Sequence, residues 1–185
     1  MRLSIAALTL LLAACTGGTG KCAHLPGGGR YCLIEGPWPE FAAEQATDVI
    51  YGDKPLRLIA RIQSGKDGLR FAGVTPLGQT LLQISWENGT LRSELPPALA
   101  DRLDAGLFPA LLQLATWPAA QVREGLSDGL TLIEKDGQRI VSDGQKNILI
   151  VSWEGTSLPY QRLRIEAPAA RLLIEARTLD EAPTP

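Results

Sequence analysis

Apolar and polar residues alternate along most of the chain from about residue 47 onward, as they do in strands that bury one face. In the segment 56–62 the even-numbered residues are apolar, whereas Arg57 and Arg61 fall on the other face. The same alternation predicts further strands at 69–74, 79–87, 91–94, 130–134, 139–142, 148–153, 161–166 and 171–177. Asn88–Gly89 and Asp136–Gly137 are two-residue hairpin signals, so neighbouring strands are expected to run antiparallel.

The segment that follows Pro96–Pro97 has a helical period instead. Leu107, Leu111, Leu114 and Trp117 are spaced for one face of a helix, and a shorter helix is expected before it at 98–103. A short helical turn is also expected around 40–45. The fold class is therefore mainly β with a helical insertion (α+β), in which a long antiparallel sheet curls and the helix covers its concave side.

The N-terminus has the pattern of a secretory signal peptide over residues 1–14. Arg2 precedes the apolar run 5–11, which is shorter than the roughly 20 residues of a membrane span. The run ends in Leu12-Ala13-Ala14-Cys15, which resembles the bacterial lipobox. That resemblance implies acylation of Cys15 and, because Thr16 rather than Asp follows, a place on the periplasmic face of the outer membrane. A plain signal peptide and a membrane anchor are the alternatives.

The rest of the chain divides into three parts by composition. We expect a lipidated tether at 15–36, one folded domain at 37–178 and a polar tail at 179–185. Cys22 and Cys32 lie within the tether and, in an oxidising compartment, are expected to form a disulfide. A partial zinc site with His24, the one histidine, is the alternative, although no fourth ligand is evident.

The charge and the motifs exclude several function classes. The chain has 18 basic and 20 acidic residues, so no basic surface for nucleic acid is expected. The sequence contains no Gly-x-Ser-x-Gly elbow and no glycine-rich phosphate loop. A single histidine outside the folded domain cannot serve a catalytic triad. We therefore expect no enzyme, no cofactor and no metal.

Several short motifs resemble the LolB-like family of outer-membrane lipoproteins, some members of which are associated with aryl-polyene gene clusters. They are the segment Phe71-Ala72-Gly73-Val74-Thr75-Pro76-Leu77-Gly78-Gln79, then Leu82 and Ile84, the segment 136–140 and the final hairpin at 163–174. The resemblance covers roughly residues 45–178. It implies an antiparallel half-open barrel with a helical lid and a hydrophobic cavity for acyl chains.

The resemblance also implies roles for particular residues. Leu77 would insert into the membrane from a protruding loop; the alternative is that it folds back onto the sheet. The expected cargo is lipid or lipoprotein, with a LolA-like carrier as a candidate donor. The residues expected to line the cavity are Leu82, Ile84, Trp86, Leu111, Leu114, Leu172 and Ile174.

Three functions follow from this reading. The first is the binding or transfer of acyl chains through the cavity. The second is a non-transporting envelope anchor or assembly factor with a filled core. The sequence favours neither a cavity nor a filled core, so both functions stay open. The third, a hydrolase of envelope polymers, is disfavoured by the absence of a catalytic constellation.

Overall fold

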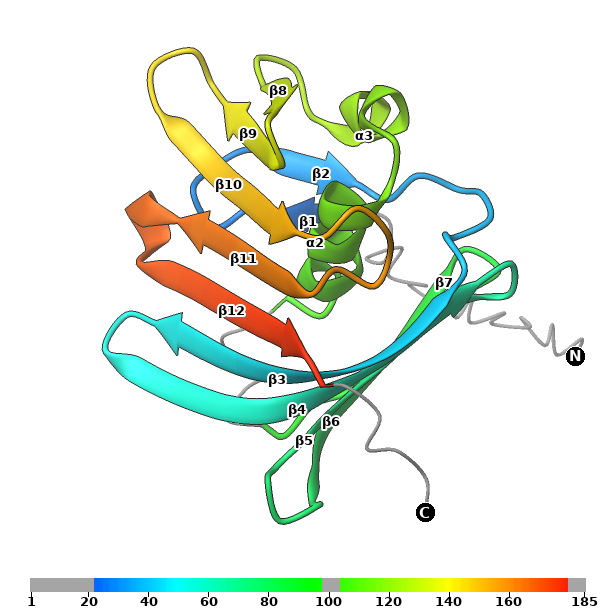
Figure 1. Cartoon of the computed structure of the whole chain (residues 1–185). Helices are drawn as coiled ribbons and strands as arrows, with labels where there is room; N and C mark the ends of the chain where they lie inside the picture. The colour runs from blue at the N-terminus through cyan, green and yellow to red at the C-terminus, as the bar shows by residue number, and fades with distance from the viewer. Residues whose placement is uncertain (1–21, 98–103, 180–185) are drawn as a thin grey trace, which may run out of the picture.

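Ten strands form one antiparallel sheet in a computed structural model that describes residues 22–97 and 104–179 (Figure 1). In chain order they are β3 (Phe41–Tyr51), β4 (Lys54–Gly65), β5 (Gly68–Val74), β6 (Thr80–Glu87), β7 (Thr90–Glu94), β8 (Thr131–Lys135), β9 (Gln138–Ser142), β10 (Asn147–Glu154), β11 (Arg162–Ala167) and β12 (Leu172–Thr178). Their spatial order is β7-β6-β5-β4-β3-β12-β11-β10-β9-β8. Two antiparallel meanders, β3–β7 and β8–β12, therefore join where β3 pairs with β12.

Tight turns set the register within each meander. Asn88 and Gly89 have φ values of 50° and 72°, and Asp136 and Gly137 have 51° and 72°. Positive φ at both central residues defines the type I′ turn, whose twist matches that of the flanking strands. Both predicted hairpins are confirmed.

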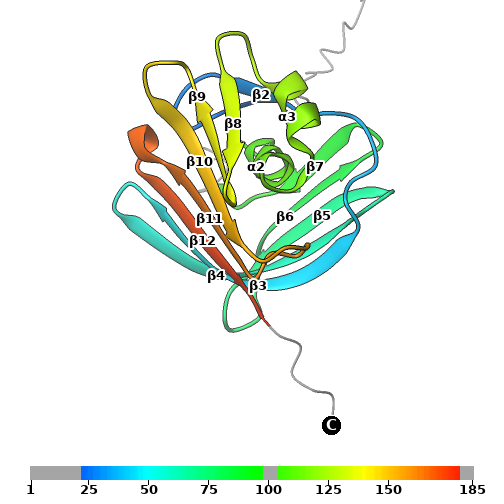
Figure 2. The ribbon, with the colours of Figure 1, turned by 45° about the horizontal axis from the view of Figure 1, so that its top comes forward.

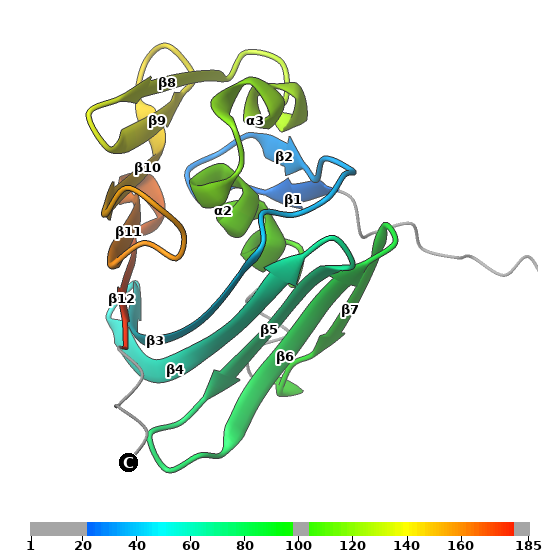
Figure 3. The same cartoon turned by 45° about the vertical axis from the view of Figure 1, so that its right-hand side comes forward.

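Two helices among the described residues lie on one face of the sheet. They are α2 (Leu107–Thr116) and α3 (Ala119–Gly125), and Pro118 separates them. Figures 2 and 3 show α2 in the space between the two meanders, with the sheet curving around it. The α+β class and the helix at 107–117 are confirmed, whereas the short helix expected at 98–103 lies outside the described residues.

The sheet is not closed into a barrel, because β7 and β8 remain its two edges among the described strands. One of these edges, β8, receives a hydrogen bond from a helix. At β8 the side chain of Arg123 on α3 donates a hydrogen bond from Nη2 to the carbonyl oxygen of Leu132, at 3.3 Å.

A 3₁₀ turn, η1 (Pro168–Ala170), joins β11 to β12 at the link that Pro168 predicts.

The folded domain begins earlier than the sequence predicts. A second, two-stranded sheet consists of β1 (Cys22–His24) and β2 (Arg30–Cys32), and its apolar residues belong to the main core. A Cβ atom on Gly27 would lie 2.3 Å from the carbonyl oxygen of Ile148, so the hairpin turn touches the backbone of β10. The tether predicted over 15–36 is therefore wrong from Cys22 onward, because this segment is folded.

The helical turn expected at 40–45 is also wrong, since β3 extends through this segment. Phe41 pairs with Ser64 and Gln45 with Ala60 on β4, and Gln45 also pairs with Thr178 on β12. Continuous pairing with β4 from Phe41 to Gln45 outweighs the local preference of Glu44 and its alanine neighbours for helix.

Candidate functional site

The residues predicted to line a cavity all lie on the inner face of the sheet or on α2. Six of them are buried, with between 0% and 6% of their surface exposed, and Ile174 is half-buried against the same core. The six are Leu82, Ile84, Trp86, Leu111, Leu114 and Leu172. Trp86, Leu111, Leu114 and Leu172 belong to one core cluster against which Ile174 packs, whereas Leu82 and Ile84 are buried outside that cluster. The structure therefore brings together five of the seven residues that the sequence assigns to one site.

The space between these side chains is filled with protein atoms. A side chain that lined a cavity large enough for an acyl chain would keep a substantial accessible surface facing it, and the six buried residues keep almost none. An acyl chain can reach this region only if α2 moves away from the sheet. In the structure as it stands, the residues form a packed core.

Polar contacts hold α2 to the N-terminal hairpin. The side chain of Gln113 is fully buried, and its Oε1 accepts hydrogen bonds from the hydroxyl of Tyr31 at 3.1 Å and from the backbone N–H of Ile34 at 3.0 Å. Its Nε2 donates to the carbonyl oxygen of Ile34 at 2.9 Å. The bond with Tyr31 is buried and the two with Ile34 are part-buried, so a Gln113 side chain without these partners would be costly.

A second polar contact joins α2 to β9. The Nη1 of Arg139 donates to the carbonyl oxygen of Leu114 at 2.7 Å, and this carbonyl belongs to the last turn of α2, where intrahelical partners end. The same guanidinium pairs with Glu134 at 2.5 Å and lies 5.3 Å from the ring centre of Trp153. The buried guanidinium of Arg139 therefore contacts a helix carbonyl, a carboxylate and an aromatic ring.

Burial also affects the titration of Tyr31. Loss of hydration raises the pKa of its hydroxyl well above the ordinary value, although the positive charge of Arg139 acts in the opposite direction. The hydroxyl therefore stays protonated and donates to Gln113 at any physiological pH. Sequence reasoning missed these three polar residues. Gln113 lies among apolar helix residues and Arg139 shares a strand face with Val141, so a polar residue at an apolar position was the available signal.

The contact of α2 with the other meander is apolar. Phe108 lies against Phe71 of β5 with ring centroids 5.4 Å apart, and no hydrogen bond between α2 and β3–β7 occurs among the described residues. Phe71 pairs across the strands with Ile62 and Ile84, which belong to the same inner row. This side of the helix is held by packing alone.

Leu77 lies at the tip of the β5–β6 turn and is 88% exposed. The backbone N–H of Thr75 donates to the carbonyl of Gln79, and Gly78 closes the turn with a positive φ of 83° and a bond to Thr75. The turn is therefore ordered by its own hydrogen bonds, and Leu77 projects from it. The alternative in which Leu77 folds back onto the sheet is wrong.

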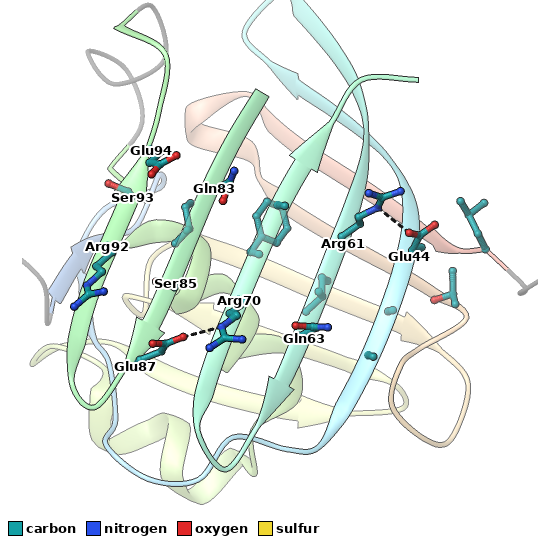
Figure 4. A pocket seen from close by; sticks show the side chains of 18 residues that line it. Glu44, Arg61, Gln63, Arg70, Gln83, Ser85, Glu87, Arg92, Ser93 and Glu94 are labelled. Atoms are coloured by element: carbon teal, nitrogen blue, oxygen red, sulfur yellow. Dashed lines mark hydrogen bonds and ion pairs between the residues drawn. The ribbon is translucent and has the colours of Figure 1, made fainter. Parts of the chain in front are cut away.

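An open groove of about 1060 Å³ lies on the outer face of β3–β7, away from the helices (Figure 4). Two rows of mostly polar residues cross its strands. One row is Ala42, Gln63, Arg70, Ser85 and Arg92, and the other is Glu44, Arg61, Ala72, Gln83 and Glu94.

Charges in this groove are balanced. Arg61 pairs with Glu44 and Arg70 with Glu87, each at 2.7 Å, on side chains that are largely open to solvent. Exposed pairs of this kind contribute little stability, and a balanced surface selects neither anions nor cations. Apolar residues also line this groove, among them Ile62, Phe71 and Ile84, so it borders one of the residues predicted to line the cavity.

Metal chemistry at the cysteines is overturned by the structure. Cys22 and Cys32 form a disulfide, so their thiols are not free to act with His24 as zinc ligands. Within residues 22–97 and 104–179 no group of three or more potential metal ligands gathers. In the same ranges, no helix has both the length and the apolar character of a membrane span. Cys15, with its predicted acyl chain, lies outside the described residues.

The fold and the site define an α+β protein in which a curved antiparallel sheet encloses a helix and presents an exposed apolar turn. Residues 42–179 match the family described as "Protein of unknown function (DUF3261)", and the chain belongs to this family. The match covers β3 to β12 but not the β1–β2 hairpin. No curated protein matches the chain.

Proposed function

We propose that this protein is a lipid-anchored protein of the bacterial outer membrane that binds or transfers the acyl chains of lipids or lipoproteins. Its fold would be a half-open barrel of the LolB type, with α2 as the lid. The observation that carries the proposal is an apolar inner sheet face to which α2 is held by packing alone. The projecting side chain of Leu77 adds to it.

Opening would occur between α2 and β4–β6. On its other side the helix is fixed by the buried bonds of Gln113 and Arg139, whereas the Phe108–Phe71 contact breaks without leaving a polar group unpaired. An acyl chain that enters there would replace apolar contacts of the helix with its own. Burial of methylene groups, at about 0.8 kcal/mol each, would offset the lost packing.

The test of cargo binding uses protein purified without detergent. Native mass spectrometry is expected to find co-purified lipid, and a fluorescent fatty-acid probe is expected to bind while amide exchange rises in α2 relative to α3. Neither co-purified lipid nor probe uptake would contradict the proposal.

The test of delivery compares two exposed apolar residues. Leu77→Glu is expected to keep folding and cargo binding but to reduce transfer to liposomes by about tenfold, since a buried Leu contributes about 1.5–3 kcal/mol. Ile133→Glu on β8 is the matched control, because Ile133 is also exposed, at 60%, but lies on the other meander. Equal transfer by wild type and Leu77→Glu would rule out the role of Leu77.

A second candidate function is favoured by the packed interior. Because six predicted lining residues are almost without exposed surface, a non-transporting envelope anchor or assembly factor fits the structure without any movement of α2. The probe experiment separates the two: this alternative predicts no uptake and no change in the amide exchange of α2.

A further inference from the structure

The edge of the main sheet at β7 carries backbone groups that have no partner among the described residues. Glu87 and Thr90 flank the two-residue Asn88–Gly89 turn, so they form a hydrogen-bonded pair, and such pairs recur at every second residue of the ladder. The N–H and C=O groups of Leu91 and Ser93 therefore point away from β6. Within the described ranges neither residue makes a backbone hydrogen bond outside the sheet. An edge of this kind is a template for another strand.

The edge at β7 is less protected than the edge at β8. At β8 the side chain of Arg123 already bonds the carbonyl oxygen of Leu132. By contrast, β7 is the outermost strand of its half of the sheet (Figure 3), and every residue in it except Leu91 is exposed. Apart from being short, β7 lacks the features that usually protect an edge strand, because it contains no proline and pairs with β6 without a bulge.

Two charged side chains at this edge lack partners. The ion pairs of the outer groove lie on β3–β6 (Figure 4). Arg92 and Glu94 face the same groove from β7, opposite Ser85 and Gln83, and neither has an ion pair with another described residue. The edge strand therefore presents one positive and one negative charge, two residues apart, on the outer face of the sheet.

We propose that β7 pairs with β7 of a second copy of this chain, in an antiparallel register centred on Ser93. A two-fold axis perpendicular to the sheet then places Ser93 opposite the second copy's Ser93, Arg92 opposite its Glu94 and Leu91 opposite its Leu95. The two sheets become one continuous sheet, and the outer groove of one copy continues into that of the other. The inference rests on the backbone and charges of β7 and does not depend on acyl handling.

This register satisfies the backbone and the side chains together. Leu91, Ser93 and Leu95 alternate with residues that face β6, so their pairs across the two-fold axis are the hydrogen-bonded ones, with about six bonds in total. Arg92 and Glu94 form the intervening pairs, in which the side chains come closest, and the symmetry gives two such ion pairs. The half-buried Leu91 and Leu95 meet on the inner face, where each gains an apolar neighbour.

The charges select this register and this partner. A register centred on Arg92 also keeps inner residues on the inner face, but it places Arg92 opposite itself, and like charges directly opposite are destabilising. When the centre is Ser93, β7 is complementary to itself in every pair, which is the property that a two-fold interface requires. A second copy is therefore the partner that fits. Because β7 has only five residues, the interface is small, and we expect a transient dimer.

The first experiment traps the pair in the full chain as a disulfide. Ser93→Cys should bring two cysteines together with Cα atoms about 5.5 Å apart, a distance that a disulfide spans. Thr131→Cys, at an exposed position on β8, is the matched control on the other edge, and the wild type measures the background from the cysteines of the chain itself. Under mild oxidation, Ser93→Cys should form covalent dimer at least about tenfold faster than Thr131→Cys. Equal rates would overturn the pairing.

The second experiment exchanges the charges in the Ser93→Cys background. Arg92→Glu and Glu94→Arg should each slow dimer trapping about tenfold, because each places like charges opposite one another in both pairs. The variant with both changes should recover to within about twofold, because opposite charges face each other again. Arg57→Glu, which makes the same change of charge on β4, should have no effect.

Recovery by the double exchange is the decisive result, because a general effect of charge or of folding would not produce it. Thermal unfolding followed by circular dichroism confirms that each variant is folded, which is expected because Arg92, Ser93 and Glu94 are exposed. If the double exchange traps no faster than the single ones, or if the single exchanges trap as fast as Ser93→Cys alone, the register centred on Ser93 is wrong.

Discussion

The two meanders of the sheet hold α2 by different chemistry. On the β8–β12 side and at the hairpin, buried hydrogen bonds of Arg139 and Gln113 fix the helix. On the β3–β7 side, the contact consists of apolar side chains such as Phe108 and Phe71. Breaking the first contact leaves buried polar groups without partners, whereas breaking the second exposes only apolar surface, which a lipid can cover.

This difference indicates that α2 would separate more easily from β3–β7 than from β8–β12. A helix that stays with one half of the sheet and separates from the other would uncover the inner row of Ile62, Phe71 and Ile84. These strands also carry the exposed turn of Leu77. The side held by packing alone and the exposed turn that we propose for membrane contact therefore belong to the same meander.

The largest expected effect is at Arg139. Arg139→Ala should lower the free energy of unfolding by about 3 kcal/mol, because it leaves the carbonyl of Leu114 and the carboxylate of Glu134 without their partner. Urea denaturation followed by tryptophan fluorescence measures the change. Arg139→Lys, which keeps the charge, should recover part of the lost stability. A loss below about 1 kcal/mol for Arg139→Ala would contradict the view that buried polar contacts hold this side of α2.

Gln113→Ala should cost about 2 kcal/mol, because the three hydrogen bonds of this buried side chain disappear. Hydrogen exchange should show that protection falls at residues 22–36 more than in β4–β6. Thr116→Ala is the control on the same helix: it removes a bond within α2 and should cost under about 0.5 kcal/mol. Equal loss of protection on both sides of α2 would argue against two kinds of attachment.

Phe108→Ala should cost about 1.5 kcal/mol, less than a fully buried Phe, because the ring is half-buried. The effect should be local, with faster amide exchange in β5 and β6 and unchanged exchange in the hairpin. The same variant should take up more of an apolar dye. If amide exchange in Phe108→Ala rises first in the β1–β2 hairpin, the contact of α2 with β3–β7 is not the weaker one.

Tyr31→Phe is expected to cost about 1 kcal/mol at neutral pH, through loss of the bond to Gln113. The pH dependence is more specific. Because burial raises the pKa of Tyr31 above the unfolded value of 10.0, its contribution is fully present below that pH and is lost as pH rises further. Urea midpoints from pH 7 to pH 11 should therefore fall more steeply for wild type than for Tyr31→Phe.

The sequence predicted the sheet well because alternation and turn chemistry are local. Asn88–Gly89 and Asp136–Gly137 alone determine two hairpins. The β1–β2 hairpin was missed because its strands have only three residues each and enclose a glycine-rich turn. A signal was nevertheless present, since Ala23 and Leu25 alternate with polar residues, as do Tyr31 and Leu33.

The candidate site was predictable only in part. Periodicity assigns Leu82, Ile84 and Leu114 to the inner surface, and the structure agrees. Whether inner residues surround a cavity or a packed core depends on how closely α2 approaches the sheet. That distance is set by long-range contacts such as Arg139 to Leu114, which no local pattern encodes.

The early start of the fold at Cys22 limits how far an acylated protein can range from its membrane. A tether running from Cys15 to residue 36 would reach at most about 75 Å, whereas seven residues up to Cys22 reach at most about 25 Å. The second value is less than the roughly 40 Å diameter of a domain of this size. With the acyl chain that we propose on Cys15, such a domain would stay against its bilayer, and a carrier would have to come to it.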